Sequence, residues 1–187
     1  MGIVLASGSP RRRSLLELLS PDFSCMRPDV DESLRIGENP RDYVSRLAIT
    51  KASAIDAAGE LILGADTTVT VDNKVLGKPE DRKEATRMLS MLSGRSHEVL
   101  TGVAARCDDV VESFVVSTSV TFATLSPGDI SRYLDTEEPW DKAGAYAIQG
   151  RGGVFVLRIE GSYSSVVGLP LVETKALMAD FGIGLEQ

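Results

Sequence analysis

The sequence predicts an α/β fold: a mixed, twisted sheet flanked by helices. Short apolar segments typical of strands alternate along the chain with amphipathic segments typical of helices. Two pairs of strand-like segments are separated only by Asp72-Asn73 and Asp108-Asp109, residues that favour hairpin turns. Because hairpins require antiparallel neighbours and strand–helix alternation favours parallel ones, we expect both kinds of pairing in one sheet.

In the first half of the chain, cap and turn residues set the boundaries of the expected elements. Asn39 before Pro40 is typical of a helix start, because Asn caps a helix and Pro suits its first position. Gly94 is typical of a helix stop. We expect a strand at 2–7, a helix at 10–19, a helix from 40 to about 58, strands at 61–70 and 74–76, and a helix at 81–92.

The second half begins with a long hairpin and ends in a helix. Ser126-Pro127 repeats the pattern of a helix start, and Pro170 lies in the first turn of the last helix. We expect strands at 97–106 and 110–125, a helix from 127 to about 134, a Gly-rich loop at 136–153, a strand at 153–159 and a helix at 169–181.

Length and charge restrict the class of protein. The 187 residues include 20 Lys and Arg against 27 Asp and Glu, which gives a net charge of −7. A chain of this length most simply forms one domain, here residues 1–187. The acidic balance argues against a nucleic-acid polymer as a partner. No apolar run approaches the ~18–20 residues that span a bilayer, so we expect no membrane association.

Thiols and imidazoles are few. Cys25 and Cys107 form neither a disulfide framework nor a CxxC pair, and the N-terminal charges follow the apolar run, which is the reverse of a secretory signal. We therefore expect a cytoplasmic protein with reduced thiols. His97 is the single histidine, which excludes histidine-rich zinc sites. We expect it to be structural rather than catalytic.

Residues 7–13 place several basic side chains at a helix start. Gly8 permits a turn after the first strand, Ser9 can cap the helix, and Arg11 and Arg12 lie in its first turn. Cations there oppose the helix dipole unless an anion binds at the free N–H groups. The pattern favours a phosphate site, with an exposed basic helix start as the alternative.

Two charged side chains fall among apolar residues. Lys51 shares a helical face with Leu47 and Ala48, where it either snorkels to solvent or directs its ammonium at an internal anion. Asp66 lies within or at the end of a strongly apolar strand, where a carboxylate must be paired, hydrogen-bonded or bound to metal. Both are therefore candidate functional residues.

Three further candidates lie in segments that favour loops. Glu32 follows a proline in a polar stretch and Lys78 follows the short hairpin; for each, a solvated surface position is the alternative. Gln149 lies in the loop 138–150, and its amide offers a donor and an acceptor, which suits the edge of a nucleobase. An incidental surface amide is the alternative.

Taken together, these segments resemble the Maf family of nucleoside triphosphate pyrophosphatases. The matching segments keep the family's order along nearly the whole chain: LASGSPRR (5–12), GADTTV (64–69), GKP (77–79), SGRSHEVLTGV (93–103), EPWDKAGAYAIQG (138–150) and GSYSSVVGLPL (161–171). Two departures are small. Ala147 stands where Gly is common, and Trp140 stands where an aliphatic residue is usual.

Three positions resemble the branch of the family described as acting on dTTP and UTP. Arg11, Thr67 and Gln149 stand where the sister branch, associated with 7-methyl-GTP, typically has Trp, Gln and Glu. The resemblance thus implies hydrolysis of a pyrimidine triphosphate to the monophosphate and pyrophosphate. It does not rank modified pyrimidines such as 5-methyl-UTP or pseudo-UTP, because one methyl group in a pocket changes binding by only ~1–3 kcal/mol.

The resemblance also implies an inosine-triphosphatase-like (Maf-like) fold, a divalent metal cofactor (Mg²⁺ or Mn²⁺), a cytoplasmic location and often a homodimer. The family's proton acceptor corresponds to Asp66. The family name is tied to inhibition of septum formation and so to cell-division arrest. A non-catalytic, nucleotide-responsive regulator of septum formation is therefore the alternative to an enzyme, although the retained carboxylates favour an enzyme.

On this interpretation the candidate residues have distinct roles. Asp66 and Glu32 would bind the metal, and Asp66 would orient or deprotonate the water that attacks the α-phosphorus. The catalytic residues would be Asp66, Glu32, Lys51 and Lys78, and the substrate-binding residues Ser7, Ser9, Arg11, Arg12, Thr67 and Gln149. A triphosphate has about four negative charges, so the basic residues would form a local cationic cradle on an acidic chain.

Overall fold

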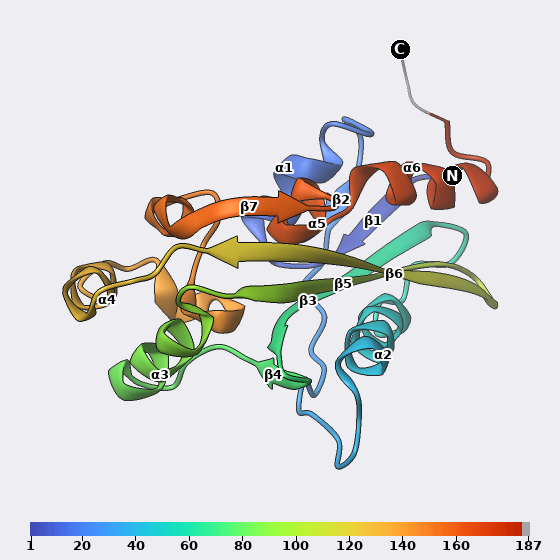
Figure 1. Cartoon of the computed structure of the whole chain (residues 1–187). Helices are drawn as coiled ribbons and strands as arrows, with labels where there is room; N and C mark the ends of the chain where they lie inside the picture. The colour runs from blue at the N-terminus through green and yellow to red at the C-terminus, as the bar shows by residue number, and fades with distance from the viewer. Residues whose placement is uncertain (185–187) are drawn as a thin grey trace. The chain divides into compact units, whose positions relative to one another are not determined.

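The computed structural model describes residues 1–184, so the last three residues of the predicted domain, 185–187, lie outside the described residues. The strands are β1 (Ile3–Ala6), β2 (Ser24–Cys25), β3 (Leu61–Val71), β4 (Lys74–Leu76), β5 (Ser96–Cys107), β6 (Val110–Phe122) and β7 (Val156–Glu160). They form one mixed sheet in the order β2-β1-β3-β5-β6-β7, with β4 paired to β3 (Figure 1). The predicted mixed sheet is confirmed.

Five of the six α-helices that accompany this sheet were predicted, and they occur in the predicted order. They are α1 (Pro10–Leu16), α2 (Pro40–Ser53), α3 (Arg82–Leu92), α4 (Pro127–Leu134), α5 (Tyr163–Val167) and α6 (Leu171–Asp180), with short 3₁₀ turns at Pro139–Asp141, Ala143–Ala145 and Arg151–Phe155. Within residues 1–184, no helix is both long enough and apolar enough to cross a bilayer.

The chain divides into two compact units. Unit 1 comprises residues 1–66, 101–116 and 168 onward, and unit 2 comprises residues 67–100 and 117–167. Strands β3, β5 and β6 contribute residues to both units, so three boundaries fall inside strands, and the fourth lies between α5 and α6. The prediction of a single domain over 1–187 stays a prediction.

Unit 1 is built on parallel pairing. β1 pairs in parallel with β2, where Val4 lies opposite Ser24, and with β3, where Ala6 lies opposite Gly64. All four residues of β1 are buried, as expected for a strand with a neighbour on each side. An apolar cluster of residues from β1, α2, β3 and β5, together with Ile55 just after α2, lies in its core: Val4, Ala6, Ala48, Ala52, Ile55, Ile62 and Ala104.

Unit 2 is built on antiparallel pairing and an aromatic core. The β3–β4 turn has positive φ at Asp72 (52°) and Asn73 (58°), as the hairpin pattern predicts. β6 pairs antiparallel with β7, with an irregularity between Thr121 and Phe122. The aromatic residues of the core pack edge to face, with ring centroids 4.7–5.9 Å apart in these pairs: Phe122 with Tyr146, Phe122 with Phe155, and Tyr133 with Phe155.

Several predicted boundaries are wrong for identifiable reasons. α2 ends at Ser53 rather than near 58, because Arg106 of β5 donates hydrogen bonds to the carbonyls of Ala52 (3.2 Å) and Ile55 (2.5 Å). α1 ends at Leu16 rather than Leu19. The strand predicted at 153–159 begins at Val156, because residues before it form a 3₁₀ turn. β2 and α5 were not predicted: they have two and five residues, too few for a clear periodicity.

Candidate functional site

The start of α1 has the predicted cap. Ser9 has extended backbone angles, and its hydroxyl accepts a hydrogen bond from the N–H of Arg12 at 3.5 Å. The N–H of Ser9 in turn donates to the hydroxyl of the buried Ser7 at 3.1 Å. Pro10 occupies the first position, and the first turn has no acidic residue. The sequence-predicted serines and arginines therefore meet at one helix start in unit 1.

Arg12 is directed inward from this helix start. Its Nε donates to the carbonyl of Gly168 at 2.9 Å, and its Nη1 donates to Ser7 Oγ at 3.5 Å. The pKa of Arg12 is lowered overall, because the effect of burial exceeds the opposing effect of the negative charges of Asp66 and Glu32. An arginine keeps its charge in proteins, so this guanidinium is a cation beside the acidic residues.

Close packing of α2 on β3 places Lys51 beside Asp66. A Cβ at Gly64 would overlap the carbonyl oxygen of Ala48 and lie 2.6 Å from the nitrogen of Ala52. Gly64 and Asp66 share a strand face, because side chains alternate along a strand. The glycine therefore allows α2 to approach closely enough for its side chains to reach the carboxylate two residues further on.

The ammonium of Lys51 joins both predicted acidic residues. Its Nζ lies 2.6 Å from Asp66 Oδ1 and 2.6 Å from Glu32 Oε1. The side chains of Lys51 and Asp66 are 7% and 10% exposed, whereas that of Glu32 is 45% exposed. Of the two alternatives for Lys51, solvent exposure is wrong. The internal anion that it meets consists of the chain's own carboxylates.

The surroundings of Asp66 shift its pKa in the direction that suits a proton acceptor. Burial raises the pKa of Asp66, and the charges of Lys51 and Arg12 oppose that shift. A carboxylate whose pKa lies above its usual range is a better proton acceptor near neutral pH than an exposed one. The position therefore fits a general base, as the sequence predicts.

Side chains that the sequence analysis missed hold the segment around Glu32. The hydroxyl of Tyr43 donates to the carbonyl of Glu32 at 2.9 Å. Arg46 donates to the carbonyl of Ser33 at 3.0 Å and makes two hydrogen bonds to the carboxylate of Glu38, at 2.5 and 2.7 Å. Tyr43 and Arg46 are three residues apart on one face of α2. That spacing was the available indication, but their partners lie in an irregular segment without periodicity.

The other predicted residues lie in unit 2. Thr67 is half-buried in β3, directly after Asp66 in the chain, whereas Lys78 and Gln149 are exposed. The structure thus brings together Ser7, Ser9, Arg12, Glu32, Lys51 and Asp66 in unit 1. The roles of all these residues, and that of Arg11 in α1, stay predictions.

The carboxylates of Asp66 and Glu32 in unit 1 fit a hard divalent cation that takes only some of its ligands from the protein. Among residues 1–184, no three His, Cys, Asp or Glu side chains are grouped closely enough to hold a metal ion. Asp66 and Glu32 nevertheless supply carboxylate oxygens around one point. Mg²⁺ is commonly bound by one or two carboxylates and completes its coordination with water and substrate phosphates. These two residues fit that arrangement.

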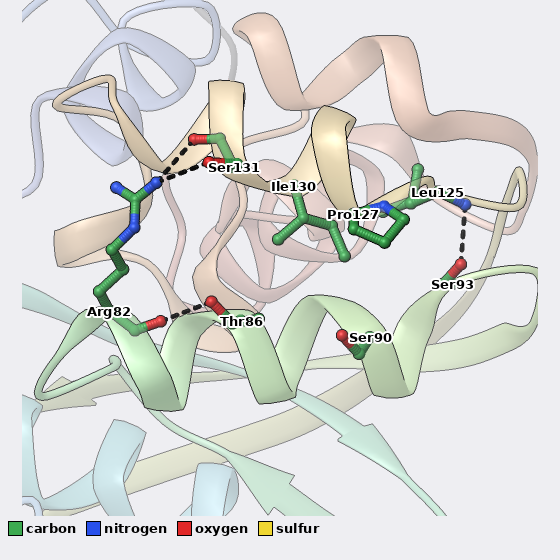
Figure 2. A pocket seen from close by; sticks show the side chains of 8 residues that line it. All are labelled: Arg82, Thr86, Ser90, Ser93, Leu125, Pro127, Ile130 and Ser131. Atoms are coloured by element: carbon green, nitrogen blue, oxygen red, sulfur yellow. Dashed lines mark hydrogen bonds between the residues drawn. The ribbon is translucent and has the colours of Figure 1, made fainter.

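A groove of about 410 Å³ lies between α3 and α4 of unit 2 (Figure 2). Arg82 crosses one end, donating to the carbonyl and hydroxyl oxygens of Ser131 at 3.0 Å each, and pairs with Asp135 at 2.8 Å. The groove is lined by Arg82, Thr86, Ser90, Ser93, Leu125, Pro127, Ile130 and Ser131. None of these is a predicted site residue.

The fold and the site define an α/β protein with a buried lysine–carboxylate cluster beside a basic helix start, an arrangement suited to a small, phosphate-bearing anion. The sequence profile described as Maf-like protein matches residues 2–181. The chain belongs to the Maf family.

Relatives at about half identity span nearly the whole chain. The chain is 54% identical over 185 residues to the dTTP/UTP pyrophosphatase of Anaeromyxobacter sp. (strain Fw109-5), covering 96% of this chain and 89% of the relative. It is 50% identical over 182 residues to the dTTP/UTP pyrophosphatase of Vibrio cholerae, covering 96% and 97%. Among solved structures, the Staphylococcus aureus Ham1 protein is 17% identical, with a TM-score of 0.48 over 66% of this chain and 72% of that one.

Proposed function

We propose that the protein hydrolyses nucleoside triphosphates, above all dTTP and UTP, to the monophosphate and pyrophosphate. The observation that supports this most directly is the buried Lys51, which pairs with both Asp66 and Glu32 at 2.6 Å. Burying charges is unfavourable unless they are paired, and a buried carboxyl group with a raised pKa, such as that of Asp66, is typical of functional sites. The names of the relatives supply the substrate class.

The basic residues bind the phosphates in this proposal. Ser7, Ser9, Arg11 and Arg12 offer hydroxyls and guanidinium groups at the start of α1, and Lys78 adds an exposed ammonium. Guanidinium groups form paired hydrogen bonds with phosphate oxygens, and the N-terminus of a helix favours anions. The charge that develops on the departing pyrophosphate is stabilised by the same groups.

Asp66 is the general base. It accepts a proton from a water molecule whose oxygen attacks the α-phosphorus, and the bond from that phosphorus to the bridging oxygen of pyrophosphate breaks. Lys51 holds the Asp66 carboxylate in one orientation through the 2.6 Å hydrogen bond to Oδ1. Glu32, on the exposed side of Lys51, shares the positive charge of the ammonium.

Asp66 and Glu32 would also hold a divalent cation, Mg²⁺ or Mn²⁺. Such a cation, when bound, neutralises phosphate oxygens and lowers the pKa of coordinated water. The two residues contribute hard oxygen donors, and the phosphates of the substrate would supply others. Lys51 pairs with both carboxylates.

Thr67 and Gln149 recognise the pyrimidine. A side-chain amide can donate to a base carbonyl and accept from the adjacent ring N–H. Thr67 follows the base Asp66 directly in β3. The nucleotide is the partner in this proposal, and a nucleic-acid polymer and a membrane are not. A cytoplasmic location agrees with the free thiols of Cys25 and Cys107, and a homodimer belongs to the same proposal.

Pyrophosphate release across a panel of nucleotides tests the proposal. We expect dTTP and UTP, with 5-methyl-UTP and pseudo-UTP included in the panel, to be hydrolysed faster than purine triphosphates, and EDTA to abolish hydrolysis. Full activity in EDTA would remove the metal from the mechanism. Tight binding of UTP without pyrophosphate release would instead favour the nucleotide-responsive regulator of septum formation.

A further inference from the structure

A single carboxylate closes the irregular segment of unit 2 that contains Gln149. The Oε1 atom of Glu138 accepts a hydrogen bond from the N–H of Arg151 at 2.6 Å, and Oε2 accepts one from the N–H of Gly152 at 3.1 Å. Glu138 stands at the beginning of the segment and its two partners stand just after Gln149. Both carboxylate oxygens are thus used to join the two ends of one loop.

The hydroxyl of Tyr133 links this carboxylate to the middle of the loop. It accepts a hydrogen bond from the N–H of Ala147 at 3.0 Å and donates one to Glu138. Burial raises the pKa of Glu138, but the N–H groups of Arg151 and Gly152, the hydroxyl of Tyr133 and the charge of Lys142 together outweigh it, and the pKa is lowered. The carboxylate is therefore ionised at neutral pH, and hydrogen bonds to an ionised acceptor are the stronger kind.

Two glycines are required for this arrangement. A Cβ at Gly150 would overlap the carboxylate of Glu138. A Cβ at Gly152 would lie 2.7 Å from the carbonyl oxygen of Ala147 and 2.9 Å from the hydroxyl of Tyr133. The backbone therefore packs directly against the carboxylate and the hydroxyl. A residue with a side chain would not fit at position 150 or 152 without displacing these groups.

A buried hydrogen bond holds the other side of Gln149. The hydroxyl of Tyr146 lies 2.9 Å from Nε2 of His97, and the two residues are 5% and 3% exposed. Main-chain or side-chain contacts thus fix positions 146, 147, 151 and 152, on both sides of the exposed Gln149. This is the arrangement expected of a recognition side chain on a rigid support.

We propose that Glu138 is a positioning residue for pyrimidine recognition: by closing the loop 138–152 it holds Gln149 in the orientation that reads the base. The inference rests on the proposed function. An amide that makes two hydrogen bonds to one base edge must be placed within about 0.5 Å, so a loosened loop loses the base contacts first. The residues proposed to bind phosphates and to accept the proton lie in unit 1, apart from Lys78, and none of them takes part in the hydrogen bonds that close the loop.

The test compares Glu138→Gln with Glu137→Gln, a matched control at the exposed neighbouring position. Glu138→Gln keeps the shape but replaces one acceptor oxygen by an NH₂ group facing an N–H donor. We expect the KM for UTP and dTTP to rise about 10-fold or more. The preference for UTP over GTP should shrink by a similar factor, while kcat and the inhibition constant of tripolyphosphate change less than about 3-fold. Glu137→Gln should resemble the wild type.

Unchanged KM and unchanged UTP preference in Glu138→Gln would overturn the proposal. Parallel loss of tripolyphosphate binding would also overturn it, because a general structural role would weaken binding of a ligand that has no base. If Glu138→Gln does not fold, Gly150→Ala displaces the same carboxylate without removing it, and the same pattern of KM and preference is expected.

Hydrogen exchange separates this proposal from the proposed function. The amides of Arg151 and Gly152 should exchange faster in Glu138→Gln than in the wild type or in Glu137→Gln, since their common acceptor is weakened. Unchanged exchange contradicts the closing role of Glu138, whatever the substrate. Failure of the wild type to hydrolyse dTTP and UTP contradicts the proposed function and leaves the exchange result to decide whether Glu138 closes the loop.

Discussion

Two irregular segments contain predicted site residues, and they are held in different ways. The segment around Glu32 in unit 1 is mostly exposed and is held by side chains of one helix, chiefly Arg46 on Glu38 and on the carbonyl of Ser33. The segment around Gln149 in unit 2 is held through its own main chain, by Glu138 and by buried hydroxyl groups. The side chains that hold the first segment come from a separate helix, whereas the carboxylate that closes the second belongs to the loop itself and packs against its backbone.

This difference matches the chemistry proposed for each segment. Glu32 is 45% exposed and would share a charge cluster whose partners change when a metal and phosphates bind, so attachment to side chains of a separate helix leaves it room to adjust. Gln149 would make directional hydrogen bonds to a base, so attachment through the main chain keeps its geometry constant. Changes in unit 1 should therefore affect all triphosphates alike, and changes in unit 2 should affect discrimination.

The largest expected effect is that of Asp66→Asn. Removing the general base should lower kcat by roughly two to four orders of magnitude for every triphosphate, with the preference for UTP retained. Asp56→Asn, at an exposed position of unit 1, is the matched control. Steady-state pyrophosphate release measures both, and a rate near that of the wild type would exclude Asp66 as the base.

A second effect concerns acid sensitivity in unit 2. Burial lowers the pKa of His97 from 6.5 to about 4, and its Nδ1 has no partner among the described residues. Between these values the unfolded chain binds a proton that the folded chain does not. The free energy of unfolding should therefore fall as the pH falls from about 6.5 to about 4, by about 3 kcal/mol in total.

Urea unfolding of the wild type and of His97→Gln across this range isolates the effect, because the variant lacks the titrating ring. Other groups titrate equally in both proteins, so the difference between the two curves reports His97 alone. Curves that stay parallel would contradict the prediction. NMR gives an independent measurement: the single imidazole should titrate near pH 4 in the folded protein.

The smallest expected effect is that of Tyr43→Phe, which removes the hydrogen bond to the carbonyl of Glu32. One such bond contributes about 0.5–1.5 kcal/mol, so kcat/KM should fall about 2- to 10-fold for all triphosphates, with the UTP preference unchanged. Tyr163→Phe, an exposed tyrosine, is the control. A changed UTP preference in Tyr43→Phe would contradict the expectation that the segment around Glu32 affects all triphosphates alike.

Much of the fold was predictable because its determinants are local. Asn39 caps α2 and Ser126 caps α4, each followed by a proline, and both helices begin where those residues predict. The positive φ angles of Asp72 and Asn73 likewise follow from the residue types that tolerate them. The end of α2 was not predictable, since the guanidinium that meets its last carbonyls comes from Arg106, 54 residues after Ala52.

The candidate site, like the fold, has features that follow from local sequence and others that depend on long-range contacts. The sequence by itself determined that Lys51 and Asp66 are anomalous, because a charge among apolar residues is unfavourable in any fold. Only the tertiary structure decided that they are partners, since the approach of α2 to Gly64 brings together side chains 15 positions apart. It also assigned Tyr43, Arg46 and Glu138 to the two segments, because their contacts are with irregular backbone, which has no sequence periodicity to reveal them.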